Sequence, residues 1–453
     1  MATTSRRLVV LIAVCMLAAG AAFAQGSETP RFVIKMDLGI GVQTFNEPGP
    51  VTYQSLGMTP DISFAKLGVG LALTINYRFT GSDSSFTIRR ADWVPDVVTF
   101  ESVVALYLPK IMYVRWGLRG DPLFLKFGSF NDGTLGDGFI MGDYDNTLFL
   151  PDDRHFGLQA GLDGSLFSFP LLGVETVLGN LVALDVLGAR LYLRPLIGTG
   201  IPLFKNLEFG ATYAVDRSPY RGTTSTGTPS PVAVFGADSR LPLVNVPNIV
   251  SLIAFADAAS IQGAWWGGMF GVGGRLINLF TYGLQFRVLG DNFIPDYFGP
   301  TYDLLRDKQY DIVMKVGPAG SVPAQVGWQA SLGTSLLDDK LIFRVSLDAP
   351  FAAPPANPTP EEALLVYPHL RGIFSLGEGL VPGITFDFSY DKKGIATFAG
   401  LVDPTNAAIK AQINFKSGPA VISFIYKIVY DPSQAGADKW NVTSGLQSSI
   451  SLF

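Results

Sequence analysis

Apolar and polar side chains alternate through "FVIKMDLGIGVQTF", residues 32–45. Phe32 and Ile34 begin one series, and Lys35 and Asp37 begin the other. Successive side chains of a β-strand point to opposite faces, so a period of two predicts a strand whose faces meet two different environments. A soluble sheet with one buried face and a sheet in a membrane give the same alternation, so this pattern alone leaves both open.

The alternation recurs along the chain, and most of its segments are long. It is found in residues 65–79, 155–166, 207–216, 280–288, 324–336, 341–348, 366–376, 380–391 and 407–416. A tilted strand needs about 9 to 11 residues to cross the apolar layer of a bilayer, whereas soluble strands average about 5 to 6. The segment lengths therefore favour strands that cross a membrane.

The connections between these segments alternate between short and long. Short turns are expected at residues 337–340, 377–379 and 416–419, and long segments near 45–61, 131–153, 217–264, 291–322 and 349–362. A barrel with short turns at one end and long loops at the other gives this pattern. "YDLLRD", residues 302–307, is expected to form a short helix within a loop. Because 97–108, 110–118 and 171–178 are weak strand candidates, the expected strand number is about 14 to 18.

The N-terminus has the features of a secretory signal peptide. Arg6 and Arg7 precede an apolar stretch over residues 8–17, and Ala22-Phe23-Ala24 forms a small-residue cleavage site. We therefore expect residues 1–24 to be a signal peptide and 25–453 to be a single domain. The only cysteine, Cys15, lies in the leader. A mature chain without cysteine excludes disulfide frameworks and thiolate sites.

Composition decides between the two environments. Hydrophobic residues make up 48% of the 453 residues and charged residues only 16%. Beyond the leader, the longest apolar stretch, residues 166–189, is interrupted by Pro170, Glu175, Asn180 and Asp185. Only helices and closed barrels satisfy backbone hydrogen bonds in hydrocarbon. The sequence thus predicts an all-β fold, a transmembrane antiparallel up-and-down β-barrel surrounded by a lipid bilayer. The net charge of −5 gives no sign of nucleic-acid binding.

These features together make the chain resemble bacterial outer-membrane β-barrels, porin-like proteins in particular. The resemblance covers the whole mature chain as architecture and includes the terminal aromatic Phe453, without indicating a specific family. The usual terminal pattern has hydrophobic residues two, four and six positions earlier, whereas this chain has Ser451, Ser449 and Gln447. The resemblance implies the outer membrane of a Gram-negative-type bacterium and the outer-membrane assembly machinery as a partner. It leaves the oligomeric state open.

If the apolar face meets lipid, the polar face lines a lumen in which basic side chains outnumber acidic ones. The candidate pore-lining residues are Lys35, Lys66, Arg78, Arg190, Arg194, Arg275, Arg287, Arg344, Arg371, Lys410 and Lys427. Rings of Arg and Lys in a water-filled pore favour anions. The alternative is that these charges pair with acids on neighbouring strands and only keep the wall hydrated.

The segment 131–153 has six aspartates and no Lys or Arg. General porins fold an acidic loop from a similar position into the barrel, facing a basic wall. The resemblance therefore implies a constriction loop carrying Asp132, Asp137, Asp143 and Asp145. Asp-Gly pairs also form ordinary turns, so a plain surface loop stays open as the alternative. The segment lacks the spacing of an EF-hand, and no metal site is predicted.

Enzymatic chemistry has little support. The two histidines, His155 and His369, are expected on strands near a barrel rim, and no spacing pairs either with a nucleophile. We predict no catalytic residues and no cofactor. The leading hypothesis is a channel for passive diffusion of small polar solutes, with anions preferred.

Two other functions remain alternatives. One is transport of hydrophobic compounds, resembling the long-chain fatty-acid transporter class, because Val421, Ile425 and Val429 share a face with Lys427. The other is a surface adhesin or structural barrel that works through its long loops.

Overall fold

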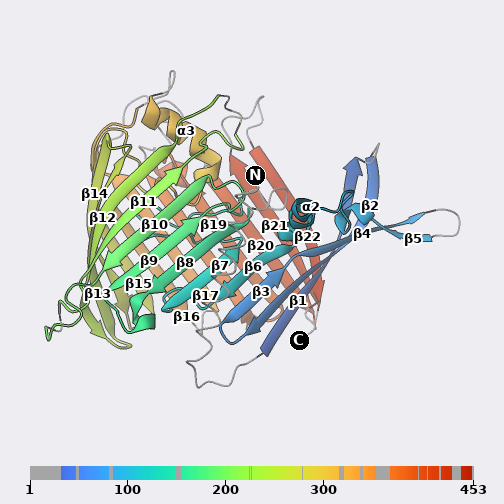
Figure 1. Cartoon of the computed structure of the whole chain (residues 1–453), viewed down its shortest axis with the longest axis horizontal. Helices are drawn as coiled ribbons and strands as arrows, with labels where there is room; N and C mark the ends of the chain where they lie inside the picture. The colour runs from blue at the N-terminus through green and yellow to red at the C-terminus, as the bar shows by residue number, and fades with distance from the viewer. Residues whose placement is uncertain are drawn as a thin grey trace.

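The alternating segments form the strands of one antiparallel sheet in the computed structural model of the chain (Figure 1). The structure describes residues 32–46, 50–80, 85–148, 155–201, 203–223, 225, 227–277, 279–315, 321–336, 340–352, 368–395, 397–405, 407–417, 420–430 and 440–450. The expected signal peptide 1–24, the terminal Phe453 and most of the expected loop 349–362 lie outside these residues.

The described residues contain 22 strands, two α-helices and four short 3-10 helices. The first strands are β1 (Phe32–Asn46), β2 (Pro50–Phe64), β3 (Leu67–Leu71), β4 (Leu73–Thr80), β5 (Ser85–Ile88), β6 (Ile111–Trp116), β7 (Leu123–Gly128), β8 (Gly157–Asp163), β9 (Leu172–Leu178), β10 (Val186–Leu193) and β11 (Glu208–Asp216). The remaining strands are β12 (Val232–Val246), β13 (Val250–Ile261), β14 (Trp265–Leu276), β15 (Phe280–Leu289), β16 (Gln325–Leu336), β17 (Leu341–Pro350), β18 (His369–Val381), β19 (Ile384–Lys392), β20 (Ala407–Ser417), β21 (Ala420–Tyr430) and β22 (Trp440–Ile450). The helices are α2 (Phe100–Tyr107), α3 (Tyr302–Met314), η1 (Arg90–Asp92), η2 (Leu108–Lys110), η3 (Gly164–Phe167) and η4 (Phe398–Leu401).

The strand pairings follow chain order. From β6 to β22 each strand pairs antiparallel with the next, as β14 does with β15 and β20 with β21. β1 pairs with β2 and also lies beside β22, so the two ends of the sheet meet and the sheet curves into a barrel (Figure 1). The predicted all-β, antiparallel up-and-down barrel is confirmed.

The expected strand number of about 14 to 18 was too low. β3 and β4 pair one after the other with β2, but only β3 also pairs with the wall strand β6, and β5 pairs only with β4 among the described residues. The larger error was to take 45–61 and 217–264 as loops, since they contain most of β2 and all of β12 and β13. Prolines within β2 and β12 made these two segments look like loops. Pro242 lies at a register shift in β12, and the break between β3 and β4 at Ala72 lies opposite Thr59 and Pro60.

Two of the three weak strand candidates are confirmed. Residues 110–118 contain β6, and residues 171–178 contain β9. The third, 97–108, was wrong because it contains the helix α2, whose N-cap Thr99 accepts a hydrogen bond from the backbone N–H of Ser102.

Most tight turns lie at one end of the barrel and most long connections at the other; the exceptions among the described residues are the three-residue turn 262–264 between β13 and β14 and the connection 194–207 between β10 and β11. β2 and β3 are joined by two residues, of which Ala65 has a φ of +52°, and β12 and β13 by three, with Asn248 at +64°. The short turn expected at 377–379 was misplaced, because β18 continues to Val381 and the chain turns at 382–383. The helix expected at 302–307 is confirmed within α3, which is longer.

The outer face of the wall is apolar and exposed. Its large exposed side chains include Leu191, Phe209, Tyr213, Phe235, Phe270, Leu284, Leu332 and Phe424. Along β10, Leu191 is 57% exposed while the next inward residue, Arg190, is 3% exposed. Contiguous exposed apolar surface of this kind marks contact with lipid or with another protein. Within the described residues, no helix has the length and apolar character to cross a membrane.

Candidate pore and two inner loops

The connection after β7 folds into the barrel. Residues 129–148, here called inner loop 1, close on themselves through an antiparallel bridge between Gly133 and Tyr144. The backbone N–H of Phe130 also donates to Asn146 Oδ1 at 2.8 Å. Leu135 and Met141 lie against Gly188, on the inward face of β10, where a Cβ would come within 2.8 Å of Leu135 Cδ1. The glycine therefore gives inner loop 1 the space to contact the wall.

The connection after β15 lies against inner loop 1. Residues 290–315, here called inner loop 2, include α3, drawn at one end of the barrel in Figure 1. Met141 and Phe298 form a parallel bridge between the loops. The rings of Phe139 and Phe293 stack with their centroids 5.4 Å apart. The two loops therefore form one packed unit.

This unit and the wall enclose the main hydrophobic core of the molecule. The loops contribute Phe130, Leu135, Phe139, Ile140, Met141, Tyr144, Phe293, Ile294, Tyr297, Phe298, Tyr302, Tyr310 and Val313. The wall contributes the buried side chains Val177, Val186, Ala214, Val232, Val234, Ala259, Ile261, Met269 and Leu289 from β9 to β15. The apolar inner surface of this part of the wall is thus covered by protein.

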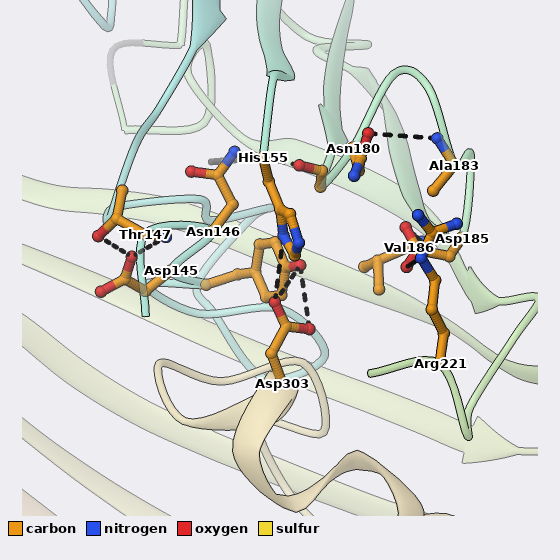
Figure 2. A network of polar contacts seen from close by, with 12 residues as sticks. Asp145, Asn146, Thr147, His155, Asn180, Ala183, Asp185, Val186, Arg221 and Asp303 are labelled. Carbon is orange, nitrogen blue, oxygen red and sulfur yellow. Dashed lines mark hydrogen bonds and ion pairs between the residues drawn. The ribbon is translucent and has the colours of Figure 1, made fainter. Parts of the chain in front are cut away.

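Polar contacts fix inner loop 1 near the start of β8. Asn146 Nδ2 donates to the carbonyls of Gly128 at 3.2 Å and Gly179 at 3.0 Å. Tyr144 Oη donates to the carboxylate of Asp303 on α3 at 3.1 Å. His155 Nδ1 lies 3.9 Å from the same carboxylate, and Figure 2 shows the two side chains pointing toward one another. Asp303 of inner loop 2 therefore contacts both inner loop 1 and the segment just before β8.

Arg306 holds α3 to the wall. Its guanidinium lies 2.6 Å from Asp216 of β11 and 3.2 Å from Asp185, and it is 3% exposed. Tyr302 Oη donates to Asp216 at 2.7 Å. These charges are deeply buried; Asp216 has Arg306 as its counter-charge, and Asp185 has Arg306 together with Arg221 at 3.9 Å.

Burial shifts several acids of the inner loops toward their neutral forms. It raises the pKa of Asp303 to about 6 and that of Asp296 to about 8. Burial also raises the pKa values of Asp137 and Asp145. Asp296 Oδ1 is buried and has no hydrogen-bond partner among the described residues.

Inner loop 1 contacts well-separated parts of the wall. Asp137 lies 3.6 Å from Arg240 of β12, and Asp143 lies 3.0 Å from Arg371 of β18. Lys427 Nζ of β21 donates to the carbonyl of Leu148. In Figure 1, β9 to β12 lie at the front of the barrel and the orange and red strands at the back. The loop therefore crosses the barrel interior.

The four candidate aspartates all lie on inner loop 1. Asp132 Oδ1 accepts a hydrogen bond from Gln159 Nε2 at 2.8 Å, and Asp145 Oδ1 accepts from the backbone N–H of Thr147 at 2.7 Å. Asp137 and Asp143 make the two ion pairs to the wall.

Several candidate pore-lining residues are ion-paired. Arg190 lies 2.6 Å from Asp238, 2.8 Å from Glu208 and 3.3 Å from Glu175. Arg194, just after β10, contacts Asp163 at 2.5 Å. Arg287 lies 3.8 Å from Asp348. For these three the described contacts match the alternative in which wall charges pair with neighbouring acids.

Other candidate pore-lining residues are exposed rather than buried in ion pairs. Arg275, Arg344 and Lys410 are exposed and follow the inward series of β14, β17 and β20. Lys427 pairs in register with Lys410 across β20 and β21.

Three candidate pore-lining residues lie away from both the ion-paired and the exposed inward-facing candidates. Lys66 lies in the tight turn after β2, 3.6 Å from Asp121. Arg78 lies on β4 with its guanidinium 5.1 Å from the ring of Tyr53. Lys35 pairs in backbone register with Asp61, and its side chain lies outside the described part.

One of the two histidines lies on a strand as predicted, and the other does not. His369 begins β18, as expected, and lies between Asp348 at 3.4 Å and Asp391 at 3.1 Å. His155 was expected on a strand but precedes β8, where it contacts inner loop 2. Arg306 and Asp303 were not among the residues that the sequence predicted for the site. Their only signal was their spacing of three residues in the expected helix, which does not reveal that the helix is buried in the barrel.

Comparison with solved structures gives distant matches to bacterial proteins. Pseudomonas aeruginosa OpdL matches with a TM-score of 0.33 and 10% identity over 93% of this chain and 99% of its own. P. aeruginosa OpdK with vanillate gives the same TM-score and identity over 93% and 98%. Acinetobacter baumannii OccAB4 gives 0.30 and 9% over 94% and 97%. No family model and no curated protein matches the chain. The barrel assignment therefore rests on the strand pairings described above.

Proposed function

We propose that the protein is an outer-membrane channel for the passive diffusion of small polar solutes, with anions preferred. The observation that carries this proposal is the path of inner loop 1 across the barrel, from Arg240 on β12 to Arg371 on β18. A loop held across a lumen narrows it without needing a cofactor or a catalytic group. The proposed surroundings are a lipid bilayer outside the wall and small solutes inside it.

The preference for anions is supported by the charges on the wall. Lys410 and Lys427 lie directly opposite one another on β20 and β21. Like charges at opposed cross-strand positions are destabilising, and the single carboxylate of Asp145 on inner loop 1 offsets the repulsion of the two lysines only in part. Exposed Arg344 and Arg275 add positive charge along the inward series of β17 and β14. Basic groups lining a pore raise the local concentration of anions.

Transport of hydrophobic compounds has weaker support. Ile425 does share the inward series with Lys427, as the register Gln412↔Ile425 and Lys410↔Lys427 requires. The larger apolar inner surface, on β9 to β15, is covered by the inner loops. A hydrophobic solute would therefore find little free apolar wall in the described part of the barrel.

Planar-bilayer recording tests the proposal. The purified protein should give stable conductance steps whose reversal potential in a salt gradient indicates anion preference. The double variant Lys410→Glu/Lys427→Glu should reduce or invert that preference. Lys205→Glu is the matched control, because Lys205 is an exposed lysine in the connection between β10 and β11. Silent bilayers would contradict the channel, and cation preference in the wild type would contradict the anion preference alone.

The proposed outer-membrane location also raises the questions of how the barrel is inserted and how many copies associate. The wall is expected to be inserted by the outer-membrane assembly machinery. Native mass and pull-down of the insertion machinery from cells test these two points separately from conductance.

A further inference from the structure

The hairpin of β4 and β5 leaves the barrel wall. β3 pairs with β6 as far as Leu71, after which the strand continues as β4 and pairs with β2 and β5. In Figure 1 the hairpin projects sideways from the barrel, with α2 near its base. The backbone N–H of Ala72 donates to the carbonyl of Lys110 at 2.7 Å, where the segment 89–110 rejoins the wall.

The register assigns the two faces of this hairpin. A cross-strand row runs from Gly68 through Arg115, Lys126, Gln159 and Val177 to Gly188, which lies under inner loop 1, so this row faces inward. The opposite series of β2, β3 and β4 therefore faces outward. That outward series continues as Tyr77 and Phe79 of β4, which pair with Ile88 and Phe86 of β5.

The outward face of the hairpin is aromatic and exposed. Phe79 is 58% exposed and Phe86 57% exposed. Their ring centroids lie 5.8 Å apart, and Tyr77 lies 5.5 Å from Phe86. Ile88 is exposed beside them. Rings that pack on one another yet stay open on one side form a preorganised apolar surface.

The opposite face is polar, and the part of it next to β2 is covered. Asn76 Nδ2 donates to Asp92 of η1 at 2.8 Å, and the backbone N–H of Arg89 donates to the carbonyl of Asn76. Tyr53, Ser55 and Asn76 are buried on this side. The protein thus covers the polar face with its own chain beside β2, whereas Thr87 at the outer strand β5 is exposed, and it leaves the apolar face open. A hairpin in water would do the reverse.

We propose that the outward face of β4 and β5 contacts the acyl chains of the bilayer, as a lateral extension of the barrel's outer surface. The inference rests on the proposed membrane location. Its first support is continuity, because the aromatic face continues the outward series of the wall and so meets the same surroundings. A lipid surface also accepts a small apolar area without a complementary shape.

The segment that covers the hairpin carries the side chains of a membrane interface. Lys110 Nζ lies 5.1 Å from the ring centroid of Trp93 and 5.6 Å from that of Tyr107. Tyr107 Oη donates to the carbonyl of Trp93 at 2.8 Å. Trp and Tyr gather at the headgroup level of membranes, and a nearby lysine favours anionic headgroups. Val98 in the same segment is 76% exposed and adds apolar surface to it.

Site-specific fluorescence in lipid tests the inference. The only cysteine, Cys15, lies in the expected signal peptide, so a mature chain with Phe86→Cys carries a single thiol for an environment-sensitive dye. In vesicles containing nitroxide-labelled phospholipids, the dye at position 86 should be quenched several-fold and its emission should shift to the blue. Thr87→Cys is the matched control, because the adjacent residue lies on the opposite face, paired with Arg78. It should be quenched much less.

A second control separates this inference from the proposed function. Phe270→Cys, on the outward face of β14, reports whether the barrel itself lies in lipid. Quenching at 270 without quenching at 86 overturns the hairpin inference and leaves the barrel in the membrane. Loss of quenching at both positions overturns the membrane location. Efficient cross-linking of position 86 between two copies, with no lipid quenching there, assigns the face to a second chain and also overturns the inference.

Discussion

Arg371 of β18 donates a hydrogen bond to Asp143 of inner loop 1 at 3.0 Å, joining residues 228 positions apart in the sequence. The contact ties the loop to the part of the wall that its hydrophobic core does not reach. The core holds the loop against β9 to β15, so this ion pair fixes its other side.

Removing this pair should widen the passage without weakening the fold. Both side chains are partly exposed, at 26% and 52%, so the pair contributes no more than about 1 kcal/mol to stability. For Arg371→Ala we expect a larger single-channel conductance and an almost unchanged unfolding midpoint. Arg344→Ala removes another inward arginine that is not ion-paired among the described residues, and it serves as the control. Equal conductance changes in both variants would show that charge alone, rather than the loop contact, sets the conductance.

Breaking the ion pairs of Arg306 should lower the stability of the fold, unlike breaking the pair of Arg371 and Asp143. Arg306→Met leaves Asp216 buried without its guanidinium and Asp185 with only Arg221 at 3.9 Å, and losing one partner of a buried pair costs about 3 to 5 kcal/mol. We expect a clear loss of stability in urea or heat unfolding in detergent, together with larger and noisier conductance as α3 detaches. Lys308→Met, on the same helix but only partly buried, is the control. An unfolding midpoint equal to that of the control would argue against the role given to Arg306.

Asp303 should make stability depend on pH. Burial raises the pKa of Asp303 in the folded state to about 6, above the value of about 3.9 in an unfolded chain. The folded protein therefore binds the proton more tightly. This contribution is fully present below about pH 4 and is lost as pH rises through about 6, with an upper limit of roughly 3 kcal/mol. In Asp303→Asn the unfolding midpoint should change less between pH 4 and 7 than in the wild type. An identical pH profile in the two proteins would rule out Asp303 as the source.

Two adjacent glycines of β14 give a test of inner-loop packing. A Cβ on Gly267 would lie 2.4 Å from the ring of Phe293, whereas on Gly268 its nearest neighbour is the carbonyl oxygen of Asp257 at 3.4 Å. Gly267→Val should displace Phe293 and with it the stacked Phe139, at a cost of about 1 to 3 kcal/mol. We expect faster proteolysis of both inner loops and altered conductance. Gly268→Val, on the outward face, should leave both loops as protected as in the wild type. Loops equally protected in both variants would contradict the packing described.

The sequence predicted the strands whose alternation is undisturbed and missed those in which it is interrupted. Residues 207–216 show the period of two plainly and form β11. β2 and β12 contain prolines and polar residues, so their local pattern suggested loops. They form strands because neighbours such as β1 and β13 supply a complete ladder, with the irregularities placed at a strand break and at a register shift.

By itself the sequence determined the two-faced strands, the all-β class and the apolar outer surface. These depend on side-chain alternation, which is a property of neighbouring residues. Only the tertiary structure decided that residues 129–148 lie inside the barrel rather than on its surface. That outcome depends on Phe139 and Met141 packing on Phe293 and Gly188, residues far away in the chain, and on the burial of apolar surface that exists only once the wall has curved.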